Sequence, residues 1–356
     1  MEQTPNARRL SDVDRNFAAQ TLRTPLRWMN ITAASPLLRG LISDGGTPFC
    51  RLPRAVAEAV NPQVAELYAN ASGGRLHILT DSRTLAVRVT LGRRLICSHM
   101  TYLGVAGLDV YRKDGGAWAF AGSLIPQDTA ADSFEASVSL PGGMQALLVY
   151  LPLYAEVRSL ELGLEDGCAV SPAAAPEQHV VFYGSSITQG GCAPRPGISY
   201  PAIVSRRLGV FFTNLGFSAG ARAEAPILGY LCTLPMDALV FDYDHNAPDA
   251  DALEQTHLPA YKLLRAKRPA LPILLASAPL ALPDAEWLRR RQIVLETYRY
   301  AKAHGDTRVG FVDGAAMYPP ALRAECSVDG IHPNALGMRC MADAFEPPLR
   351  SLLQSI

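Results

Sequence analysis

The sequence predicts an α/β fold for the second half of the chain and a β-rich first half. From about residue 180 onward, short apolar runs alternate with helical segments. The first half instead holds short strand-like runs separated by Gly, Asp and Ser turns, and an Ala- and Pro-rich segment at 165–178 divides the halves. With 356 residues, the chain is also longer than one ordinary domain. We therefore expect two domains, at residues 1–170 and 171–356.

Five apolar runs in the second half are predicted to be buried strands. They cover residues 180–183, 211–215, 238–241, 273–276 and 309–312, and helical periodicity is clearest over 249–267 and 284–304. Such alternation predicts a mostly parallel five-stranded sheet with helices on both faces. In sheets of this kind, functional groups gather at the carboxyl ends of the strands.

The first half is predicted to be a β-sandwich of the jelly-roll kind. Strand-like runs cover residues 76–79, 85–91 and 146–151, and the first two predict a hairpin with its turn at 80–83. A further turn at 113–116 follows the run LDVYR. Many short strands at this spacing favour a sandwich.

Charge and composition exclude several classes of partner. The 33 basic and 33 acidic side chains balance, which argues against binding to nucleic acid or an anionic membrane. The first thirty residues contain no apolar run of signal-peptide length, and no segment reaches the ~20 apolar residues that span a bilayer. Seven scattered cysteines without a C-x-x-C pair predict reduced thiols rather than disulfides or a zinc site. We expect a cytoplasmic protein.

The strongest chemical signal is HVVFYGSSITQGG, in which an apolar strand ends at Gly184 before Ser185 and Ser186. A serine in a tight turn at a helix entry can expose its hydroxyl beside backbone N–H groups, as nucleophilic attack requires. The alternative is that both serines only cap the next helix.

The second signal is SVDGIHPNALGM near the C-terminus, where Asp329 and His332 lie three residues apart. A serine nucleophile needs a base, and that base needs an acceptor that fixes its tautomer. One D-x-x-H loop can provide both. The alternative is an Asp turn followed by an ordinary surface histidine.

Two further segments supply candidates for an oxyanion hole. Gly216 follows the second expected strand in NLGFSAGA, and Asn246 follows the third in FDYDHNAPD. A glycine N–H and an asparagine amide suit the stabilisation of a developing oxyanion. Taken alone, each is more simply explained as an ordinary residue, Gly216 of a turn and Asn246 of a loop.

Taken together, these segments resemble the SGNH, or GDSL-like, hydrolase superfamily from about residue 180 to the C-terminus. The resemblance implies a three-layer α/β/α fold and a reaction without a metal or cofactor. It also implies Ser186 as nucleophile, His332 as general base and later acid, and Asp329 as the orienting carboxylate. Ser186 N–H, Gly216 N–H and the Asn246 amide would form the oxyanion hole. Two departures stand out: Ser185 replaces the usual Asp of G-D-S, and the third block is D-H-N rather than G-x-N-D.

The run GLDVY, at residues 107–111, resembles the G-x-D-L-Y motif of a β-rich domain that precedes some SGNH esterase domains. Asp109 and Tyr111 are accordingly expected to have a structural role. Arg195 is a candidate substrate contact, with a structural salt bridge as the alternative. His245 could act as a base but is expected to line the cleft, and the Asp242 and Asp244 pair lacks the further carboxylates of a cation site.

The sequence therefore predicts a serine esterase that hydrolyses a short-chain acyl ester. Family analogy makes O-acetyl groups on a carbohydrate the first choice of substrate, which would be a small molecule or an oligosaccharide. The same triad could hydrolyse a lipid or another short-chain ester. A catalytically silent carbohydrate-binding protein is the alternative from another class. A homodimer is a further hypothesis.

Overall fold

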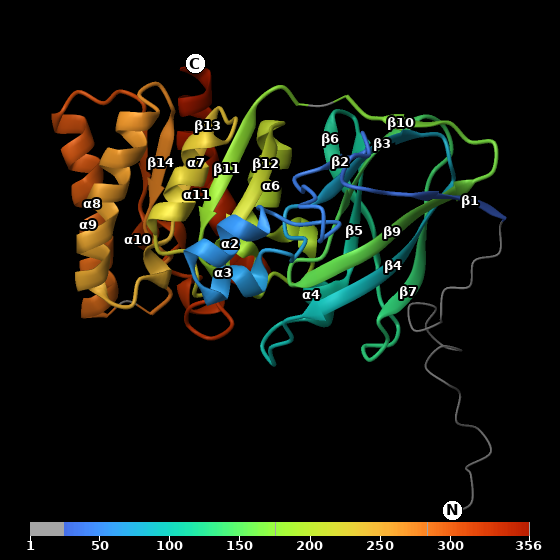
Figure 1. Ribbon diagram of the computed structural model, residues 1–356, viewed down its shortest axis with the longest axis horizontal. Coiled ribbons are helices and arrows are strands. Elements are labelled where there is room, and N and C mark those ends of the chain that lie inside the picture. Colours follow the sequence, from blue (N-terminus) through green and yellow to red (C-terminus); the bar gives the residue numbers. More distant parts are fainter. Residues whose placement is uncertain (1–24, 175, 283, 356) are drawn as a thin grey trace, which may run out of the picture.

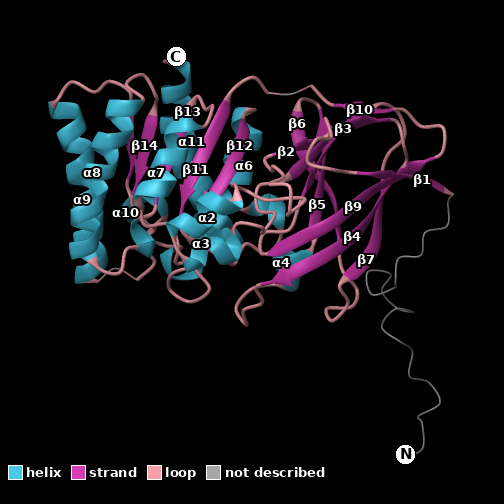
Figure 2. Cartoon of the chain, viewed as in Figure 1, coloured by secondary structure: helices cyan, strands magenta, loops and turns pink. Residues whose placement is uncertain are grey.

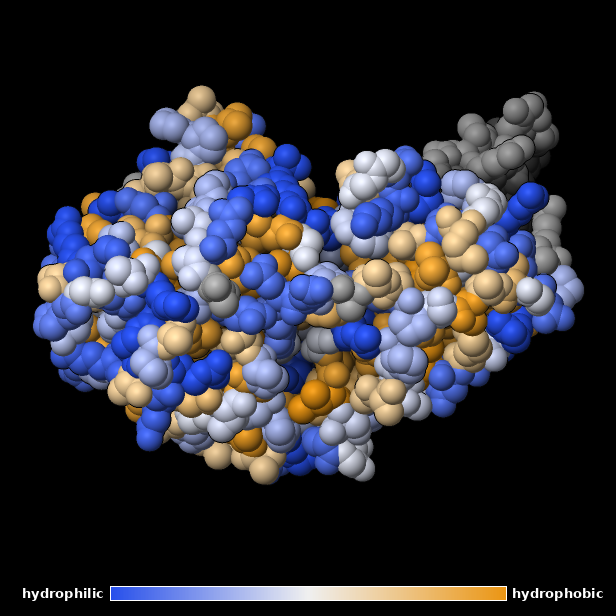
Figure 3. Space-filling view, turned by 90° about the horizontal axis from the view of Figure 1, so that it is seen from above, coloured by the Kyte–Doolittle hydropathy of each residue, from blue (hydrophilic) through white to orange (hydrophobic). Residues whose placement is uncertain are grey.

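The computed structural model describes residues 25–174, 176–282 and 284–355, in which a β-rich half packs beside an α/β half (Figure 1). Coloured by secondary structure, the strands of the first half stand apart from the helix-covered sheet of the second (Figure 2). Seen from above, the two halves form lobes that meet at an indentation, with hydrophilic and hydrophobic residues interspersed on this face (Figure 3). The expected two-part fold is confirmed.

Two antiparallel sheets make up the β-rich half. One has the order β1 (Leu26–Asn30), β9 (Ala155–Glu165), β4 (Thr84–Arg94) and β7 (Ser133–Ser139). The other has the order β10 (Val170–Pro172), β3 (Arg75–Thr80), β8 (Gln145–Tyr150), β5 (Leu108–Asp114) and β6 (Ala117–Leu124), with β2 (Leu38–Arg39) also paired to β3. Inward-facing residues of both sheets, such as Ile78 and Val87, are fully buried in one core. This is the predicted sandwich.

The predicted hairpin with its turn at 80–83 is wrong. Strand β3 pairs with β8, β10 and β2, whereas β4 pairs with β7 and β9 in the other sheet. The turn carries the chain between sheets, and the Ser82 hydroxyl donates to Thr84 O at 2.6 Å inside it. Inward-facing apolar and outward-facing polar residues alternate along two strands that face each other across a sandwich, just as they do along two hydrogen-bonded strands. The local pattern therefore could not distinguish them.

Within residues 25–174, three short helices interrupt the β-rich half: α2 (Arg54–Val60), α3 (Pro62–Leu67) and α4 (Tyr102–Ala106). None was expected from the sequence. Helices α2 and α3 do not cover the sandwich, since their buried residues Ala57 and Val64 belong to a core cluster of the α/β half. The N-terminal half thus contributes directly to the packing of the other domain.

The α/β half contains a five-stranded sheet in which every pairing is parallel. Its order is β12 (Phe211–Gly216), β11 (His179–Gly184), β13 (Ala238–Asp242), β14 (Ile273–Ala276) and β15 (Val309–Val312). Its helices are α5 (Ser186–Gln189), α6 (Tyr200–Leu208), α7 (Ala225–Thr233), α8 (Ala250–Lys267), α9 (Ala285–Ala303), α10 (Gly314–Met317) and α11 (Ala335–Gln354). Short 3₁₀ turns are η2 (Pro196–Ile198), η3 (Asp244–Asn246) and η4 (Arg323–Glu325). The five expected strands and both expected long helices are present.

Each strand of this sheet is buried on both faces, as its continuous apolar run requires. Val180 and Phe182 of β11 belong to the cluster that includes α6 and α11. Val181 and Tyr183 belong to the opposite cluster, with α7, α8 and α9. Each such side chain, when fully buried, contributes roughly 1.5–3 kcal/mol. The result is a three-layer α/β/α domain.

The motif GLDVY joins the two halves. The buried carboxylate of Asp109 accepts from Gly197 N at 2.9 Å and from Arg195 Nη1 at 2.7 Å. Tyr111 OH donates to Gly197 O at 3.3 Å. Asp109 and Tyr111 therefore have the expected structural role. In the part of the chain that the structure describes, no helix is long and apolar enough to cross a membrane.

Candidate active site

The strand order places three candidate segments at one edge of the sheet. Strand β11 lies between β12 and β13, so the next two strands of the chain lie on opposite sides of it. Loops after the carboxyl ends of strands at such a switch point form the crevice of an open α/β sheet. Ser186 follows β11, Ala219 follows β12 and Asn246 follows β13, and all three line one cavity.

The sequence left open whether Ser185 and Ser186 cap the next helix or expose a hydroxyl, and the structure shows that the two serines differ. Ser185 is 1% exposed, and its hydroxyl accepts from Ile187 N at 3.2 Å as the N-cap of α5. Ser186 begins the helix and faces the cavity. The turn needs glycine at 184, because a Cβ there would lie 2.1 Å from Thr188 Oγ1 and 2.2 Å from Asp242 O. Ser185 thus fixes the turn, and the half-buried Ser186 faces the cavity.

The Asp329–His332 loop is a closed turn before α11. Val328 N donates to His332 O at 2.9 Å, and Gly330 takes a positive φ of 86° at the bend. Asn334 caps the helix through Leu336 N and Gly337 N. This turn folds the Asp329 carboxylate back onto its own loop, beneath the imidazole of His332.

The structure brings Ser186, His332 and Asp329 into one chain of hydrogen bonds. Ser186 Oγ lies 2.9 Å from His332 Nε2, and His332 Nδ1 lies 2.8 Å from Asp329 Oδ2. The other carboxylate oxygen accepts from His332 N at 2.7 Å and from Ile331 N at 3.0 Å. Burial alone would raise the pKa of Asp329, but these hydrogen bonds outweigh it and lower the pKa to about 2. The carboxylate is therefore ionised and keeps the proton of His332 on Nδ1.

Gly216 is not brought to this site. Its N–H donates to Asn214 Oδ1 at 2.9 Å, so it is not free for an oxyanion. A Cβ at Gly216 would lie 2.3 Å from Gln189 N, which gives this glycine a packing role against α5. The cavity is instead lined by Ser218 and Ala219, further along the same loop. Ala219 has a φ of 54°, and its N–H has no acceptor among the described residues.

Asn246 does lie at the cavity, as expected. It is 9% exposed, and its Nδ2 donates to Phe217 O at 2.7 Å. This bond fixes the amide beside the loop that carries Ala219. An Nδ2 group has a second hydrogen that remains available for a ligand. Ser186 N–H also has no acceptor among the described residues, as expected for the first residue of a helix.

The cavity at the triad measures about 410 Å³ and belongs to both halves of the chain. From the N-terminal half come Leu95, Cys97, His99, Met100 and Tyr154. From the C-terminal half come Ser186, Gly191, Ser218, Ala219, His245, Asn246, Trp287, Ile331 and His332. The contribution of the first group was not predicted, because neither the loop between β4 and α4 nor the connection between β8 and β9 carries a local chemical motif.

Tyr154 is the most closely connected of these unpredicted residues. Its OH donates to Ser186 O at 3.1 Å and lies 2.9 Å from Ser218 Oγ. Burial raises the pKa of this phenol far above its ordinary value, so it stays protonated. One buried hydroxyl thereby joins the nucleophile helix to the loop after β12.

His245 is one of the residues that line the cavity. Its ring stacks on Trp287 with centroids 4.3 Å apart and an interplanar angle of 10°. Burial, with a smaller contribution from nearby His332, lowers the pKa of His245 to about 3. The ring is therefore uncharged at neutral pH and is poorly suited to serve as a base.

Arg195 lies outside this cavity. Its Nη1 donates to Asp109 Oδ2 at 2.7 Å and to Tyr111 OH at 2.8 Å, and its guanidinium lies 3.9 Å from the centroid of the Phe120 ring. The structure therefore supports the salt-bridge alternative rather than the substrate contact. Asp242 likewise has a structural role, accepting from Tyr200 OH at 2.7 Å and Thr188 Oγ1 at 3.1 Å.

Two family models match the chain in succession. Residues 26–170 match the model described as GxDLY, the N-terminus of Esterase_SGNH_hydro-type, and residues 177–350 match the GDSL-like Lipase/Acylhydrolase family. The C-terminal domain is a GDSL-like lipase/acylhydrolase domain. The order of the two GDSL-associated domains agrees with the resemblance drawn from Ser186 and from GLDVY. No curated protein matches the chain.

Solved structures share this two-domain arrangement. A protein from Bacteroides ovatus that is assigned as a GDSL-like lipase has 27% identity and a TM-score of 0.82 over 92% of this chain and 98% of its own. Salicylyl-acyltransferase SsfX3, from a tetracycline biosynthetic pathway, has 25% identity and a TM-score of 0.75 over 92% and 97%. A family two carbohydrate esterase from Cellvibrio japonicus, at 14% identity and a TM-score of 0.58 over 93% and 99%, shares the fold alone.

Proposed function

We propose that the GDSL-like domain hydrolyses short-chain acyl esters through Ser186, His332 and Asp329. The observation that carries the proposal is the unbroken relay from Ser186 Oγ to His332 Nε2, at 2.9 Å, and from His332 Nδ1 to Asp329 Oδ2, at 2.8 Å. Ser186 Oγ attacks the ester carbonyl while its proton moves to His332 Nε2. His332 then returns that proton to the departing alcohol. Water, deprotonated in turn by His332, releases the acid and regenerates Ser186.

The oxyanion of each tetrahedral intermediate would be held by three donors at the ends of β11, β12 and β13. They are Ser186 N–H, Ala219 N–H and the free hydrogen of Asn246 Nδ2. The first two lack acceptors among the described residues, and the third is fixed by its bond to Phe217 O. Donors that are already oriented stabilise developing charge without reorganisation. Ala219 takes the position that the sequence assigned to Gly216.

The cavity has ample room for a short acyl group. Its volume is about 410 Å³, and apolar side chains line it together with the polar groups of His99, Tyr154, Ser218 and His245. An O-acetylated carbohydrate remains our first substrate to test, with the acetyl group held in the cavity and the sugar toward its open side. The support is that exposed His99 from the N-terminal half lies at this cavity, where a polar alcohol could meet it.

Acyl transfer to an alcohol is a second candidate. The cavity walls around His332 include Leu95, Met100 and Ile331, which limit the hydration of an acyl-enzyme. The similar salicylyl-acyltransferase is consistent with this chemistry. The stacked rings of His245 and Trp287, which both line the cavity, would also suit stacking with a planar acyl group.

Release of p-nitrophenol from p-nitrophenyl esters of increasing acyl length tests the proposal. We expect turnover to be fastest with acetate, and to fall by roughly 10³-fold or more in Ser186→Ala and His332→Ala. Ser185→Ala, which removes only the helix cap, is the matched control and should lose much less. Full activity in Ser186→Ala would exclude the proposed nucleophile.

The substrate class requires a second comparison. Acetate release from acetylated oligosaccharides, phenyl acetate and short-chain glycerides should rank the first highest if the carbohydrate proposal holds. Adding an alcohol acceptor then separates the two outcomes, because a transferase forms a new ester where a hydrolase forms free acid. If the wild type binds oligosaccharide but cleaves no ester, the binding-protein alternative is correct.

A further inference from the structure

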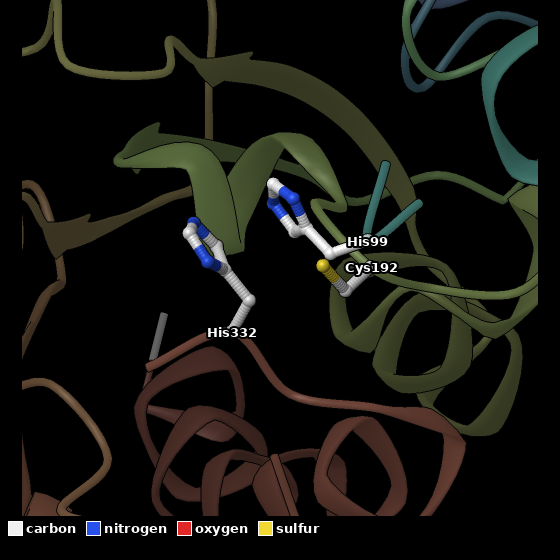
Figure 4. Close-up of side chains that lie close together, drawn as sticks. All are labelled: His99, Cys192 and His332. Carbon is white, nitrogen blue, oxygen red and sulfur yellow. The ribbon is translucent and has the colours of Figure 1, made fainter. Parts of the chain in front are cut away.

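Three side chains that are far apart in the sequence and share no motif lie close together beside the proposed nucleophile: His99, Cys192 and His332. One ring nitrogen of each histidine and Sγ of the cysteine all lie within 4.8 Å of one another. His99 comes from the loop after β4, Cys192 from the segment after α5, and His332 from the loop before α11. Figure 4 shows the Cys192 sulfur directed toward the two imidazole rings.

We propose that these three residues form a binding site for Zn²⁺ that reversibly blocks the enzyme. The inference rests on the proposed function in one respect, which is that His332 is the base. A thiolate and two imidazoles are a donor set that Zn²⁺ prefers, and three protein ligands leave a fourth tetrahedral position for water. The present separations must shorten for coordination. His99 can supply that movement, because it is exposed on a loop.

The contact between His332 and Asp329 determines which ring nitrogen of His332 would coordinate the metal. Nδ1 is held by Asp329 Oδ2 at 2.8 Å, which leaves Nε2 as the nitrogen that can exchange its partner. A histidine that ligates zinc through one nitrogen while a carboxylate holds the other is a recurring arrangement in metalloproteins. The pair that orients the base for catalysis therefore also orients it for metal binding.

Charge and proton balance are consistent with this site. The Cys192 thiol loses its proton to solvent on coordination, so Zn²⁺ and the thiolate together carry one positive charge. The carboxylate of Asp329 lies next to His332 and neutralises that charge. No oxidant or reductant takes part. Burial and nearby Asp329 raise the pKa of Cys192 to about 12, so the thiol is protonated before metal enters.

Coordination would block catalysis directly. Ser186 Oγ and the metal compete for the same Nε2, which lies 2.9 Å from Ser186 Oγ in the free site. With the metal bound, the serine hydroxyl has no base to receive its proton. Removal of the metal by a chelator restores the relay, so the block is reversible.

The binding test uses Co²⁺ in place of Zn²⁺, because tetrahedral Co²⁺ with a thiolate ligand has visible d–d bands and a sulfur-to-metal charge-transfer band. We expect both bands in wild type and their displacement by Zn²⁺. Cys192→Ser should lose the charge-transfer band, and His99→Asn should weaken binding by at least roughly tenfold. Cys232→Ser removes a partly exposed thiol from α7 and should behave as wild type. Ser186→Ala should bind Co²⁺ at least as tightly as wild type, because Nε2 then has no competing partner.

Inhibition provides the second readout. Zn²⁺ should inhibit wild type and Cys232→Ser alike, with recovery on adding a chelator, whereas Cys192→Ser should need at least roughly tenfold more Zn²⁺. If Cys192→Ser shows the wild-type cobalt spectrum, or if the metal leaves no thiolate signature in wild type, the site is excluded. The cobalt titration does not depend on esterase activity, so it tests the metal site even if the proposed function fails.

Discussion

Asp329 holds His332 through both of its carboxylate oxygens, with Oδ2 2.8 Å from the ring Nδ1 and Oδ1 2.7 Å from the main-chain nitrogen. The first contact sets the tautomer of the ring, and the second sets the shape of the loop that carries it. A single side chain thus controls both the tautomer of His332 and the position of its ring. Substitutions at Asp329 can separate these two effects.

Asp329→Asn should keep most of the loop and lose the charge. We expect kcat on p-nitrophenyl acetate to fall by about 10²- to 10⁴-fold, because an amide can stabilise the wrong tautomer of His332 and cannot balance its positive charge. KM should change little. Asp329→Ala should lower both kcat and the free energy of unfolding, since Ile331 N and His332 N also lose their acceptor. Equal kcat for Asp329→Asn and wild type would argue against the triad.

The same carboxylate should make stability depend on pH. The pKa of Asp329 in the folded protein, about 2, is below its ordinary value of 3.8. Its contribution to stability is therefore complete above about pH 4 and is lost as the pH falls from there toward 2. Urea unfolding of wild type and Asp329→Asn should show a difference at pH 6 that narrows toward pH 3. A difference that stays constant over this range would contradict the assignment.

Tyr154→Phe tests the contribution of the N-terminal half to the site. Removal of the OH leaves Ser186 O and Ser218 Oγ without this partner, so we expect a loss of about 1 kcal/mol in the free energy of unfolding. We also expect kcat/KM to fall by about tenfold, as the nucleophile helix loses a restraint on its position. Tyr298→Phe, on α9, is the control and should change neither quantity.

The Asn246 amide tests the oxyanion hole. Asn246→Ala should lower kcat by about 10²- to 10³-fold with little change in KM, because the donor acts on charge that develops only in the transition state. The bond from Asn246 Nδ2 to Phe217 O is lost as well, so the free energy of unfolding should be measured in parallel. A rise in KM at constant kcat would assign Asn246 to binding of the ground-state substrate instead.

The fold and the meeting of Ser186, His332 and Asp329 could be predicted from sequence because their signals are local. Strands β11 to β15 are short apolar runs that need no partner to be recognised, and Ser186 and the Asp329 loop directly adjoin such elements. Their spacing fixes which side chains share a loop. Because the carboxyl ends of parallel strands lie at the same edge of the sheet, these loops are then predicted to meet.

The predictions that failed depend on contacts between distant segments. The turn at 80–83 joins two sheets, which the alternation of β3 and β4 cannot reveal. Gly216 was chosen as the glycine directly after a strand, but Asn214 takes its N–H and Ala219 reaches the cavity. The cavity loop at 95–100 and Tyr154 were missed for the same reason, since only tertiary packing brings them to Ser186.

Arg195 offers a test that separates domain packing from substrate binding. Arg195→Leu leaves the carboxylate of Asp109, which is 0% exposed, without its cation. Loss of one partner of a buried pair costs about 3 kcal/mol, so the free energy of unfolding should fall by that order, while KM and kcat stay near wild type. Arg158→Leu, at an arginine whose side chain is 60% exposed, is the matched control and should shift stability by no more than about 0.5 kcal/mol. An unchanged stability together with a raised KM would instead assign Arg195 to the substrate, because a residue that only joins the domains cannot alter affinity without altering their packing.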